Sequence, residues 1–195
     1  MARKKIGIIG NGNVGSALAR GFRCIGHDVR VVSDDKRDLR QVAAWGEVVL
    51  FAVPYGAIDD VVRDAGEALA GKTVIDATNA LDPSMDLAVG FTTSGAEELQ
   101  KKLPEARVVK AFNTIFAQHM DFGQLDGNLL TAFVASDDVG AKQTVMELAR
   151  GIGFDAVDAG SLKNARLLEP LASLNIQLGH VLGMGTQIGF KLLHD

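Results

Sequence analysis

The stretch KIGIIGNGNVG, residues 5–15, decides the fold class that we predict for this chain. An apolar run leads into three glycines in G-x-G-x-x-G spacing, and a helical pattern begins before the third of them. In this context Gly10 permits a tight turn, Gly12 lets the backbone approach a pyrophosphate, and Gly15 lets the helix pack closely on the sheet. The free N–H groups and the positive end of the helix dipole then bind the anion. We predict that a dinucleotide pyrophosphate is held by Gly10, Asn11, Gly12, Asn13, Val14 and Gly15.

The rest of the chain repeats this alternation of short apolar runs and longer amphipathic stretches. The strand candidates are Lys5–Ile9, Asp28–Val32, Val48–Val53, Thr73–Asp76, Val108–Phe112, Leu130–Ala135 and Ala156–Asp158. The helix candidates are Val14–Ile25, Ala57–Leu69, Ala96–Leu103 and Val139–Ile152. Strands that alternate with helices are typical of a parallel sheet with crossover helices. We therefore predict an α/β, Rossmann-like, doubly wound and mostly parallel sheet.

Helix boundary signals support two of these helices and leave the last segment less regular. Ser94 and Glu97 form a capping box, and Asp137 and Asp138 stand where the fourth helix begins. The segment from about residue 164 to 193 is predicted as one long helix or a pair broken at Pro170, which lacks an N–H. We expect residues 1–160 to form a dinucleotide-binding domain and residues 161–195 a C-terminal helical extension of the same compact unit.

Composition excludes several classes of partner. The chain has 195 residues, with 20 Lys and Arg against 24 Asp and Glu, and a net charge of −4 gives no reason to expect nucleic acid or an anionic membrane. Cys24 is the single cysteine, so an internal disulfide is impossible and a reducing compartment fits best. The first apolar run is too short for a signal peptide, and no run approaches the roughly 18 to 20 apolar residues of a membrane helix. We expect a cytoplasmic protein without a membrane segment.

The residues after the second strand leave the choice of dinucleotide open. Asp34 lies 19 residues after Gly15, near the place where an acidic residue binds the ribose 2′-hydroxyl of NAD. Lys36 and Arg37 favour the 2′-phosphate of NADP, to which Ser33 can also donate. We expect Ser33, Asp34 and Lys36 to contact the adenosine end of whichever dinucleotide binds.

Three segments reach the edge where parallel sheets bind ligands, at the carboxyl ends of the strands. They are Ala52-Val53-Pro54-Tyr55, Ala77-Thr78-Asn79 and Ala111-Phe112-Asn113-Thr114. Val53 and Pro54 offer an apolar wall for a nicotinamide ring, whereas Asn79, Asn113 and Thr114 offer neutral hydrogen-bonding groups. Each of these is also an ordinary residue of a turn after a strand.

The sequence indicates neither a catalytic side chain nor a metal site. The four histidines, His27, His119, His180 and His194, have no metal-ligand spacing, and no nucleophile motif is present. Such a cleft fits direct hydride transfer between two bound redox rings, for which the protein supplies orientation and excludes water. Two alternatives stay open: a dinucleotide-binding sensor without turnover, and an NAD-linked reductase of a small carbonyl or imine that would use Tyr55 or His119 as proton donor.

Several motifs in one order carry a resemblance to a known family. They are the glycine turn, Val53-Pro54, the stretch VVKAFNTI at Val108–Ile115, the stretch DAGSLKNARLLE at residues 158–169, and Gly183-Met184-Gly185. In these the chain resembles the NADPH-dependent F420 reductases across nearly its whole length. The stretches VVKAFNTI and DAGSLKNA are also similar to the cytosolic reductase domain of six-transmembrane metalloreductases, which uses NADPH to reduce a flavin.

The resemblance implies an oxidoreductase that exchanges a hydride between NADP(H) and F420, a deazaflavin, or a flavin. It places NADP at Gly10, Asn11, Asn13, Val14, Ser33 and Lys36, with Val53, Pro54 and Ala77 near the nicotinamide. It places the deazaflavin at Asn113 and Ile115. Two positions depart from the family pattern, because Asp34 stands where the family usually has Arg, and Asn113 stands where it can have His.

The family forms dimers, and the C-terminal glycines fit that expectation. Gly179, Gly183, Gly185 and Gly189 make two G-x-x-x-G spacings, and each glycine inside a helix costs about 1 kcal/mol relative to Ala. Close helix packing in a homodimer, or against a flat cofactor, would explain them; packing on the chain's own sheet is the alternative.

Overall fold

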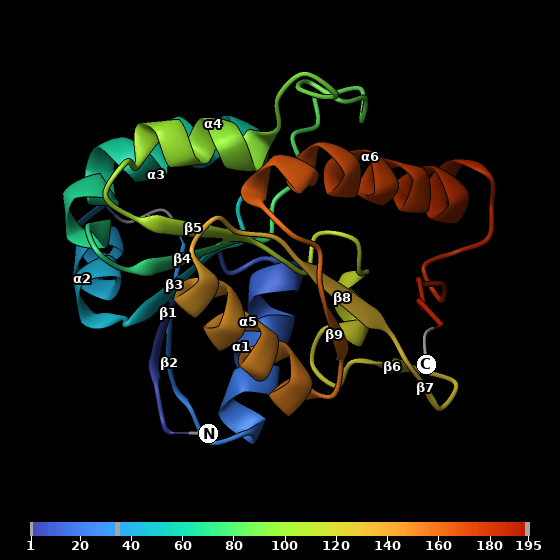
Figure 1. Ribbon diagram of the computed structural model, residues 1–195, viewed down its shortest axis with the longest axis horizontal. Helices are drawn as coiled ribbons and strands as arrows, with labels where there is room; N and C mark the ends of the chain where they lie inside the picture. Colours follow the sequence, from blue (N-terminus) through green and yellow to red (C-terminus); the bar gives the residue numbers. More distant parts are fainter. Residues whose placement is uncertain (1, 34–35, 194–195) are drawn as a thin grey trace.

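A computed structural model describes residues 2–33 and 36–193, and its centre is a parallel sheet (Figure 1). The five strands are β1 (Lys5–Ile9), β2 (Asp28–Val32), β3 (Val48–Phe51), β4 (Thr73–Asp76) and β5 (Arg107–Lys110). They pair in the order β2-β1-β3-β4-β5, and each pair is parallel. The predicted Rossmann-like, mostly parallel sheet is confirmed, and its carboxyl ends place the segments after β1, β3 and β4 side by side.

The central strands are continuous apolar runs because both faces of the sheet are covered. All four residues of β3 and of β4 are buried, including Thr73 and Asp76. On one face lie α1 (Asn13–Cys24) and α5 (Val139–Ile152), whose apolar residues join one core cluster with Ile8. On the other face α2 (Lys36–Trp45), α3 (Ile58–Ala65) and α4 (Gly95–Lys102) share the second cluster with Val49.

The predicted helix caps are confirmed. The Ser94 side chain accepts a hydrogen bond from the Glu97 N–H at 3.2 Å and donates to the Glu97 carboxylate at 2.8 Å. Asp138 accepts from the Ala141 N–H at 2.7 Å and begins α5. Short 3₁₀ turns flank α3 at Tyr55–Ala57 and Gly66–Leu69 and precede the last helix at Leu162–Asn164, and a separate one lies at Ala117–His119.

One helix was missing from the sequence prediction. Helix α2 begins at Lys36, in the charged stretch after the second strand for which no helix was predicted, and buries Leu39, Val42 and Ala43 against the sheet. These three residues have the i, i+3, i+4 spacing of an amphipathic helix, so the signal was present. The surrounding charged residues concealed it.

A second, smaller set of strands follows β5. Strand β8 (Thr131–Val134) pairs in parallel with β9 (Asp155–Asp158), and one antiparallel bridge joins Lys110 to Ala135. The short β6 (Gln124–Leu125) and β7 (Asn128–Leu129) form a hairpin. The predicted strands at Leu130–Ala135 and Ala156–Asp158 are thus confirmed within one residue at each end.

The C-terminal segment corrects the prediction of helix to residue 193. Helix α6 (Ala165–Ile176) runs through Pro170 without a break, passes into one π turn (Gln177–Val181) and ends there. Gly183 and Gly185 have φ of +75° and +73°, a left-handed conformation that ends a helix.

The glycines of this segment therefore do not form one helical face. A Cβ on Gly179 would lie 2.7 Å from the ring of Phe116, and one on Gly189 would lie 2.7 Å from Leu130. These two glycines let the chain pass close to its own core, which is the alternative given above. Within residues 2–33 and 36–193, no helix is long and apolar enough to cross a membrane.

Candidate functional site

The glycine turn has the geometry that its sequence predicts. Gly10 has a φ of +112°, and a Cβ there would lie 2.2 Å from the carbonyl oxygen of Ala52, the residue after β3. A Cβ on Gly15 would lie 1.9 Å from the Gly10 oxygen, whereas nothing lies within 4 Å of the corresponding point on Gly12. Gly12 is the N-cap of α1, and no side chain caps that end of the helix. The turn therefore leaves open space and a helix N-terminus at the carboxyl edge of the sheet, which suits an anion.

Two adjoining cavities open from this turn and share Gly12, Ala52, Val53 and Pro54. The first, which we call the cation-lined cavity, has a volume of about 710 Å³. Its remaining lining residues are Gly10, Asn11, Ser33, Lys36, Leu39, Ala57, Asp60, Val61, Arg63 and Asp64. The second, which we call the amide-lined cavity, has a volume of about 410 Å³. Its remaining lining residues are Asn13, Val14, Tyr55, Ala77, Thr78, Asn79, Leu81, Asp82 and Met85.

Charges gather at the cation-lined cavity. Lys36, the first residue of α2, lies 3.8 Å from an Asp64 carboxylate oxygen, and the Arg63 guanidinium lies 3.2 Å from the same side chain. Arg63 also pairs with Asp60 at 2.5 Å. Sequence reasoning found Ser33 and Lys36 but missed Arg63, because α3 approaches this place only through the fold. Asp34, the residue on which the choice between NAD and NADP depended, lies outside the described residues.

Neutral groups dominate the amide-lined cavity. Ala77, Thr78 and Asn79 leave β4 as one turn, and the Asn79 side chain donates to the Asn113 carbonyl oxygen at 3.0 Å. Tyr55 also lines the cavity, and burial raises the pKa of its phenol. Asp82, which the sequence analysis did not single out, accepts the N–H groups of Ser84 and Asp86 through Oδ1, so this carboxylate holds its own loop.

Asn113 and Ile115 are both buried, and Asn113 bonds Asn79 of this wall from behind. The Asn113 amide donates to Asn79 Oδ1 and to the Leu168 carbonyl of α6, each at 3.0 Å. In the described part of the chain no donor lies within hydrogen-bond distance of the buried Asn113 Oδ1. Phe112, the residue before it, has a φ of +66°, which is uncommon for a residue with a Cβ. Asn113 thus joins Asn79 to α6 in this structure.

A buried ionic cluster, which the sequence analysis missed, supports the same wall. Lys110 Nζ lies 3.0 Å from Asp76 Oδ2 and 2.9 Å from Glu169 Oε1, and all three side chains have an exposed fraction of 1% or less. Lys110 also donates to the Thr78 carbonyl at 2.6 Å. Burial alone would lower the pKa of Lys110, but the two carboxylates outweigh it and raise that pKa. The sequence signal was a charged residue at the end of each of two buried strands, where an unpaired charge is costly.

None of the described histidines, His27, His119 and His180, lines either cavity, and His194 lies outside the described residues. His119 is buried, and its Nε2 lies 3.2 Å from the Thr186 carbonyl oxygen, so it is not placed as a proton donor to either cavity. His27 is buried before β2, at the opposite edge of the sheet. Among the described residues, no group of three His, Cys, Asp or Glu side chains is arranged to hold a metal ion.

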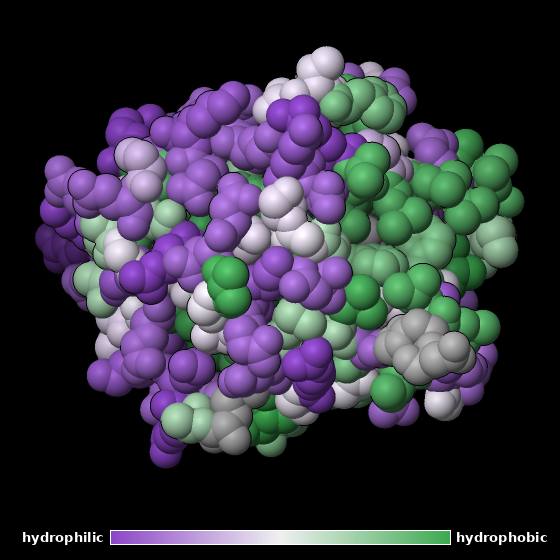
Figure 2. Space-filling view, viewed as in Figure 1, coloured by the Kyte–Doolittle hydropathy of each residue, from purple (hydrophilic) through white to green (hydrophobic). Residues whose placement is uncertain are grey.

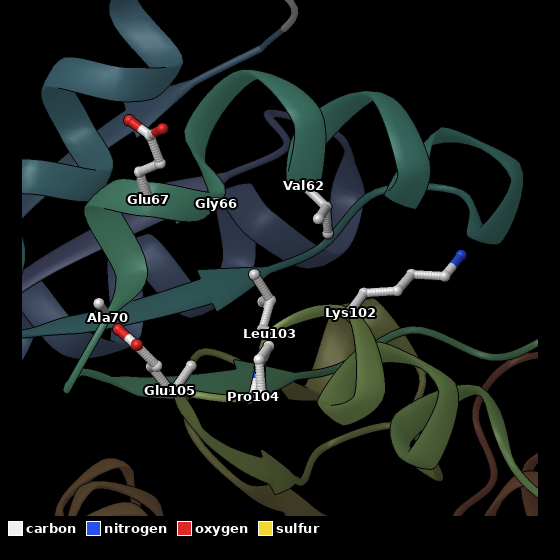
Figure 3. A pocket seen from close by; sticks show the side chains of 9 residues that line it. Val62, Gly66, Glu67, Ala70, Lys102, Leu103, Pro104 and Glu105 are labelled. Carbon is white, nitrogen blue, oxygen red and sulfur yellow. The ribbon is translucent and has the colours of Figure 1, made fainter.

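A separate hollow of about 400 Å³ lies at the opposite edge, next to the amino ends of β4 and β5 (Figure 3). Glu67 and Lys102 line it but point in different directions, so its charges do not converge on one point. Val62, Leu103 and Pro104 give it apolar walls. The glycine turn, the cations and the amides all lie at the other edge, which makes the two cavities there the candidate site.

Comparison with known proteins supports this assignment. A family model described as NADP oxidoreductase, coenzyme F420-dependent, matches residues 5–45, which contain the glycine turn. The F420-dependent NADP reductase of Methanothermobacter thermautotrophicus is 30% identical, over 89% of this chain and 88% of that protein. A solved structure from Arthrobacter sp. FB24, provisionally named an F420-dependent NADP-reductase, is 30% identical with a TM-score of 0.90, over 98% of this chain and all of that one.

A longer relative matches through only part of its length. Metalloreductase STEAP3 of Rattus norvegicus is 32% identical over 86% of this chain, and the match spans 36% of that protein. The chain therefore covers about a third of this relative.

Proposed function

The chain belongs to the family of F420-dependent NADP reductases, and from this premise we propose that it transfers a hydride between NADP(H) and coenzyme F420. The observation that carries the proposal is the pair of joined cavities on either side of the glycine turn. One cavity has cations and the other an apolar and amide wall, which matches the phosphate-bearing and ring-bearing ends of a dinucleotide.

The proposed binding of NADP follows the lining of the cleft. The pyrophosphate lies on the turn of Gly10, Asn11, Gly12, Asn13, Val14 and Gly15 at the start of α1. The adenosine end lies in the cation-lined cavity against Ser33 and Lys36, and the nicotinamide lies against Ala52, Val53, Pro54, Ala77, Thr78 and Asn79. The two cofactors supply the redox chemistry, and the protein holds both rings and excludes water.

The second ring is proposed to lie on the nicotinamide beside the amide-lined cavity. Asn113 bonds Asn79 of its wall, so we propose that Asn113 shapes the deazaflavin site through Asn79, and the buried Ile115, two residues later, is proposed to belong to the same site. A flavin in place of F420 is the alternative acceptor, supported by the resemblance to a metalloreductase.

The test is an assay of the purified protein with NADPH and each acceptor in turn, namely F420, FMN and FAD. We expect loss of nicotinamide absorbance with F420 and slower or no loss with the flavins. Absence of turnover with all three acceptors, in a protein that binds NADPH by calorimetry, would reject the reductase and favour a sensor.

The choice of NADP over NAD is also a proposal, supported by Lys36 and Arg63 at the cavity. We expect Lys36→Ala to raise the KM for NADPH about tenfold, since one charged contact to a phosphate is lost, and to change the KM for NADH little. Asp34→Arg is expected to increase the preference for NADP. A preference that neither substitution alters would place the 2′-phosphate elsewhere.

A carbonyl or imine reductase is the second candidate, because Tyr55 lines the amide-lined cavity with a raised pKa. Such a reaction needs a proton donor. Loss of carbonyl or imine reduction in Tyr55→Phe, with F420 reduction retained, would support this second activity. His119→Ala is the matched control, since His119 lies outside both cavities.

A homodimer is proposed from the surface of α6 and the residues that follow it. Figure 2 shows apolar side chains gathered on the side of the molecule where Figure 1 places this segment. The exposed apolar residues of this segment are Leu167, Leu174, Val181, Leu182, Met184, Leu192 and Leu193. We expect Leu174→Glu with Leu182→Glu to give a monomer by light scattering, whereas Val139→Glu on exposed α5 surface leaves the dimer intact. A wild-type monomer would reject the proposal.

We propose that the protein acts in the cytoplasm. Its one cysteine, Cys24, is free, so folding requires no oxidising compartment. Fractionation of the native cells tests this placement, and recovery of the protein with membranes or outside the cell would contradict it.

A further inference from the structure

Lys110 is a lysine without exposed surface at the carboxyl end of β5. Its ammonium group has three oxygen partners: Asp76 Oδ2 at 3.0 Å, Glu169 Oε1 at 2.9 Å and the Thr78 carbonyl at 2.6 Å. An ammonium group has three hydrogens to donate, so these partners use its full capacity.

The partners of Lys110 connect three elements. Asp76 also accepts the N–H of Thr78 at 2.9 Å and its hydroxyl at 2.7 Å, so the same carboxylate holds the turn after β4. Glu169 on α6 accepts the N–H groups of Gly95 and Ala96, at 2.9 and 3.1 Å, and caps the start of α4. The ammonium group therefore joins the Ala77–Asn79 turn to α6 and, through Glu169, to α4, in addition to the link that Asn113 makes between Asn79 and α6.

Lys110 itself does not line either cavity, although its partner Thr78 does. It therefore has no contact with a ligand in the cleft. What it does fix is the wall of the amide-lined cavity, where the proposed function places the nicotinamide.

Stability alone does not explain this cluster. Burying charges costs desolvation energy, and well-packed apolar residues often replace a buried ion pair without loss of stability. What apolar residues could not reproduce is a set of directed bonds that hold one carbonyl and two carboxylates around a single point. The charged cluster therefore contributes a fixed geometry of these bonds.

We propose that Lys110 is a positioning residue for hydride transfer, which holds the Ala77–Asn79 turn fixed to α6 and so sets where the nicotinamide lies. The proposal rests on the proposed function. A displacement of the reacting groups by about 1 Å can lower a rate about a hundredfold, so a rigid wall has a large effect on turnover.

The first test compares Lys110→Met with Lys72→Met. Lys72 lies at the opposite edge of the sheet, where its ammonium binds the carbonyls of Ala43, Ala44 and Gly46. Both variants are assayed well below their melting temperatures. We expect Lys110→Met to lower kcat about a hundredfold with little change in the KM for NADPH, and Lys72→Met to leave kcat unchanged. Equal losses of kcat in both variants, or a wild-type kcat in Lys110→Met, would overturn the proposal.

A milder variant covers the case in which Lys110→Met does not fold. Glu169→Gln keeps the shape of the side chain and leaves Lys110 paired with Asp76. We expect kcat to fall about tenfold, and a primary isotope effect with deuterated NADPH to increase because hydride transfer becomes slower than the other steps. Unchanged kcat and isotope effect in this variant would count against positioning.

Hydrogen exchange separates this proposal from the proposed function. Glu169 makes no direct bond to Thr78, and its connection to that residue through side chains runs by way of Lys110 and Asp76; the separate link from Leu168 through Asn113 to Asn79 is not altered by a change at Glu169. We expect Glu169→Gln to speed exchange of the Thr78 amide, with or without NADP bound, while Lys72→Met leaves it as in the wild type. Unchanged Thr78 exchange in Glu169→Gln overturns the positioning role, even if the wild type reduces F420. Faster exchange supports it even if the wild type reduces no acceptor.

Discussion

Lys72 and Lys110 lie at the two opposite edges of one sheet, and their surroundings differ. Lys72, just before β4, is partly exposed and binds three backbone carbonyls at 2.6–2.7 Å, two of which belong to the last residues of α2. Lys110, at the end of β5, is fully buried and binds two carboxylates and one carbonyl. Burial lowers the pKa of Lys72; at Lys110 burial acts in the same direction, but the carboxylates prevail and the pKa is raised.

The difference indicates what each edge of the sheet does. At the amino edge a cation satisfies the free carbonyls at the end of a helix, which is a local stabilising contact. At the carboxyl edge a cation joins three elements behind the wall of a ligand cavity. Buried charge is concentrated at the edge where parallel sheets bind ligands.

Stability measurements should give the largest contrast between the two lysines. Lys110→Met leaves Asp76 and Glu169 buried without their cation, and loss of one partner of a buried ionic cluster costs about 3 to 5 kcal/mol. Lys72→Met removes hydrogen bonds from a partly exposed ammonium to neutral carbonyls and leaves no buried charge unpaired, so we expect a loss of about 1 kcal/mol. Urea unfolding followed by circular dichroism measures both. Equal losses would show that the two edges do not differ in this respect.

Substitutions at two glycines test the same difference between the edges. A substitution at the amino edge should lower the stability of the protein, and one at the carboxyl edge should lower its affinity for NADP. A Cβ on Gly46, at the amino edge, would lie 2.9 Å from Gly7 N and from Val48 O, so we expect Gly46→Ala to cost about 1 to 3 kcal/mol of stability without changing the affinity for NADP. A Cβ on Gly12 meets nothing within 4 Å, so Gly12→Ala should change stability by less than about 1 kcal/mol.

The affinity of the Gly12 variant is the second half of this prediction. The new methyl group occupies the space that a pyrophosphate needs, and we expect the Kd for NADP to rise about tenfold, or about 1.4 kcal/mol. Calorimetric titration of both glycine variants gives the affinities. Loss of affinity in Gly46→Ala at a temperature where it is folded would contradict the division between the edges.

The sheet was predictable because it depends on local patterns. The apolar runs of β1–β5, the glycine turn and the caps at Ser94 and Asp138 are all readable within a few residues. The end of α6 was not, because Gly183 and Gly185 fit a helix-packing motif as well as the left-handed turn that they form. The spacing of these glycines is compatible with a packed helix and with a turn, and only the three-dimensional path of the chain distinguishes the two.

The candidate site was predictable where one segment carries it and not where the fold assembles it. The turn at Gly10–Gly15 and the wall at Val53 and Pro54 follow directly from strand ends. Arg63 reaches the cavity from α3, and the Lys110 cluster combines residues of β4, β5 and α6. No local sequence pattern predicts either arrangement. For Asn113 the contact with a ring stays a prediction; in the structure its amide donates to Asn79 and to the Leu168 carbonyl of α6, and the preceding Phe112 has a φ of +66°.

The smallest expected effect is a pH dependence that belongs to the amino edge alone. His27 is buried, its Nδ1 accepts the Lys4 N–H at 3.1 Å, and its Nε2 has no partner among the described residues. Burial, and next the charge of Lys4, lower the pKa of His27, although Asp28 acts in the opposite direction. Protonation of Nδ1 would also break the bond to Lys4.

The sign of the effect follows from which state binds the proton. Below the ordinary histidine value of 6.5, the unfolded chain binds a proton that folded His27 resists, so the free energy of unfolding should fall as pH falls below that value and stay level above it. Urea unfolding between pH 5 and 8 measures this slope. His27→Gln, whose amide oxygen can still accept from Lys4, should flatten it, whereas the exposed His180→Gln should not. A steep slope that survives His27→Gln would place the titrating group elsewhere and remove this difference between the edges.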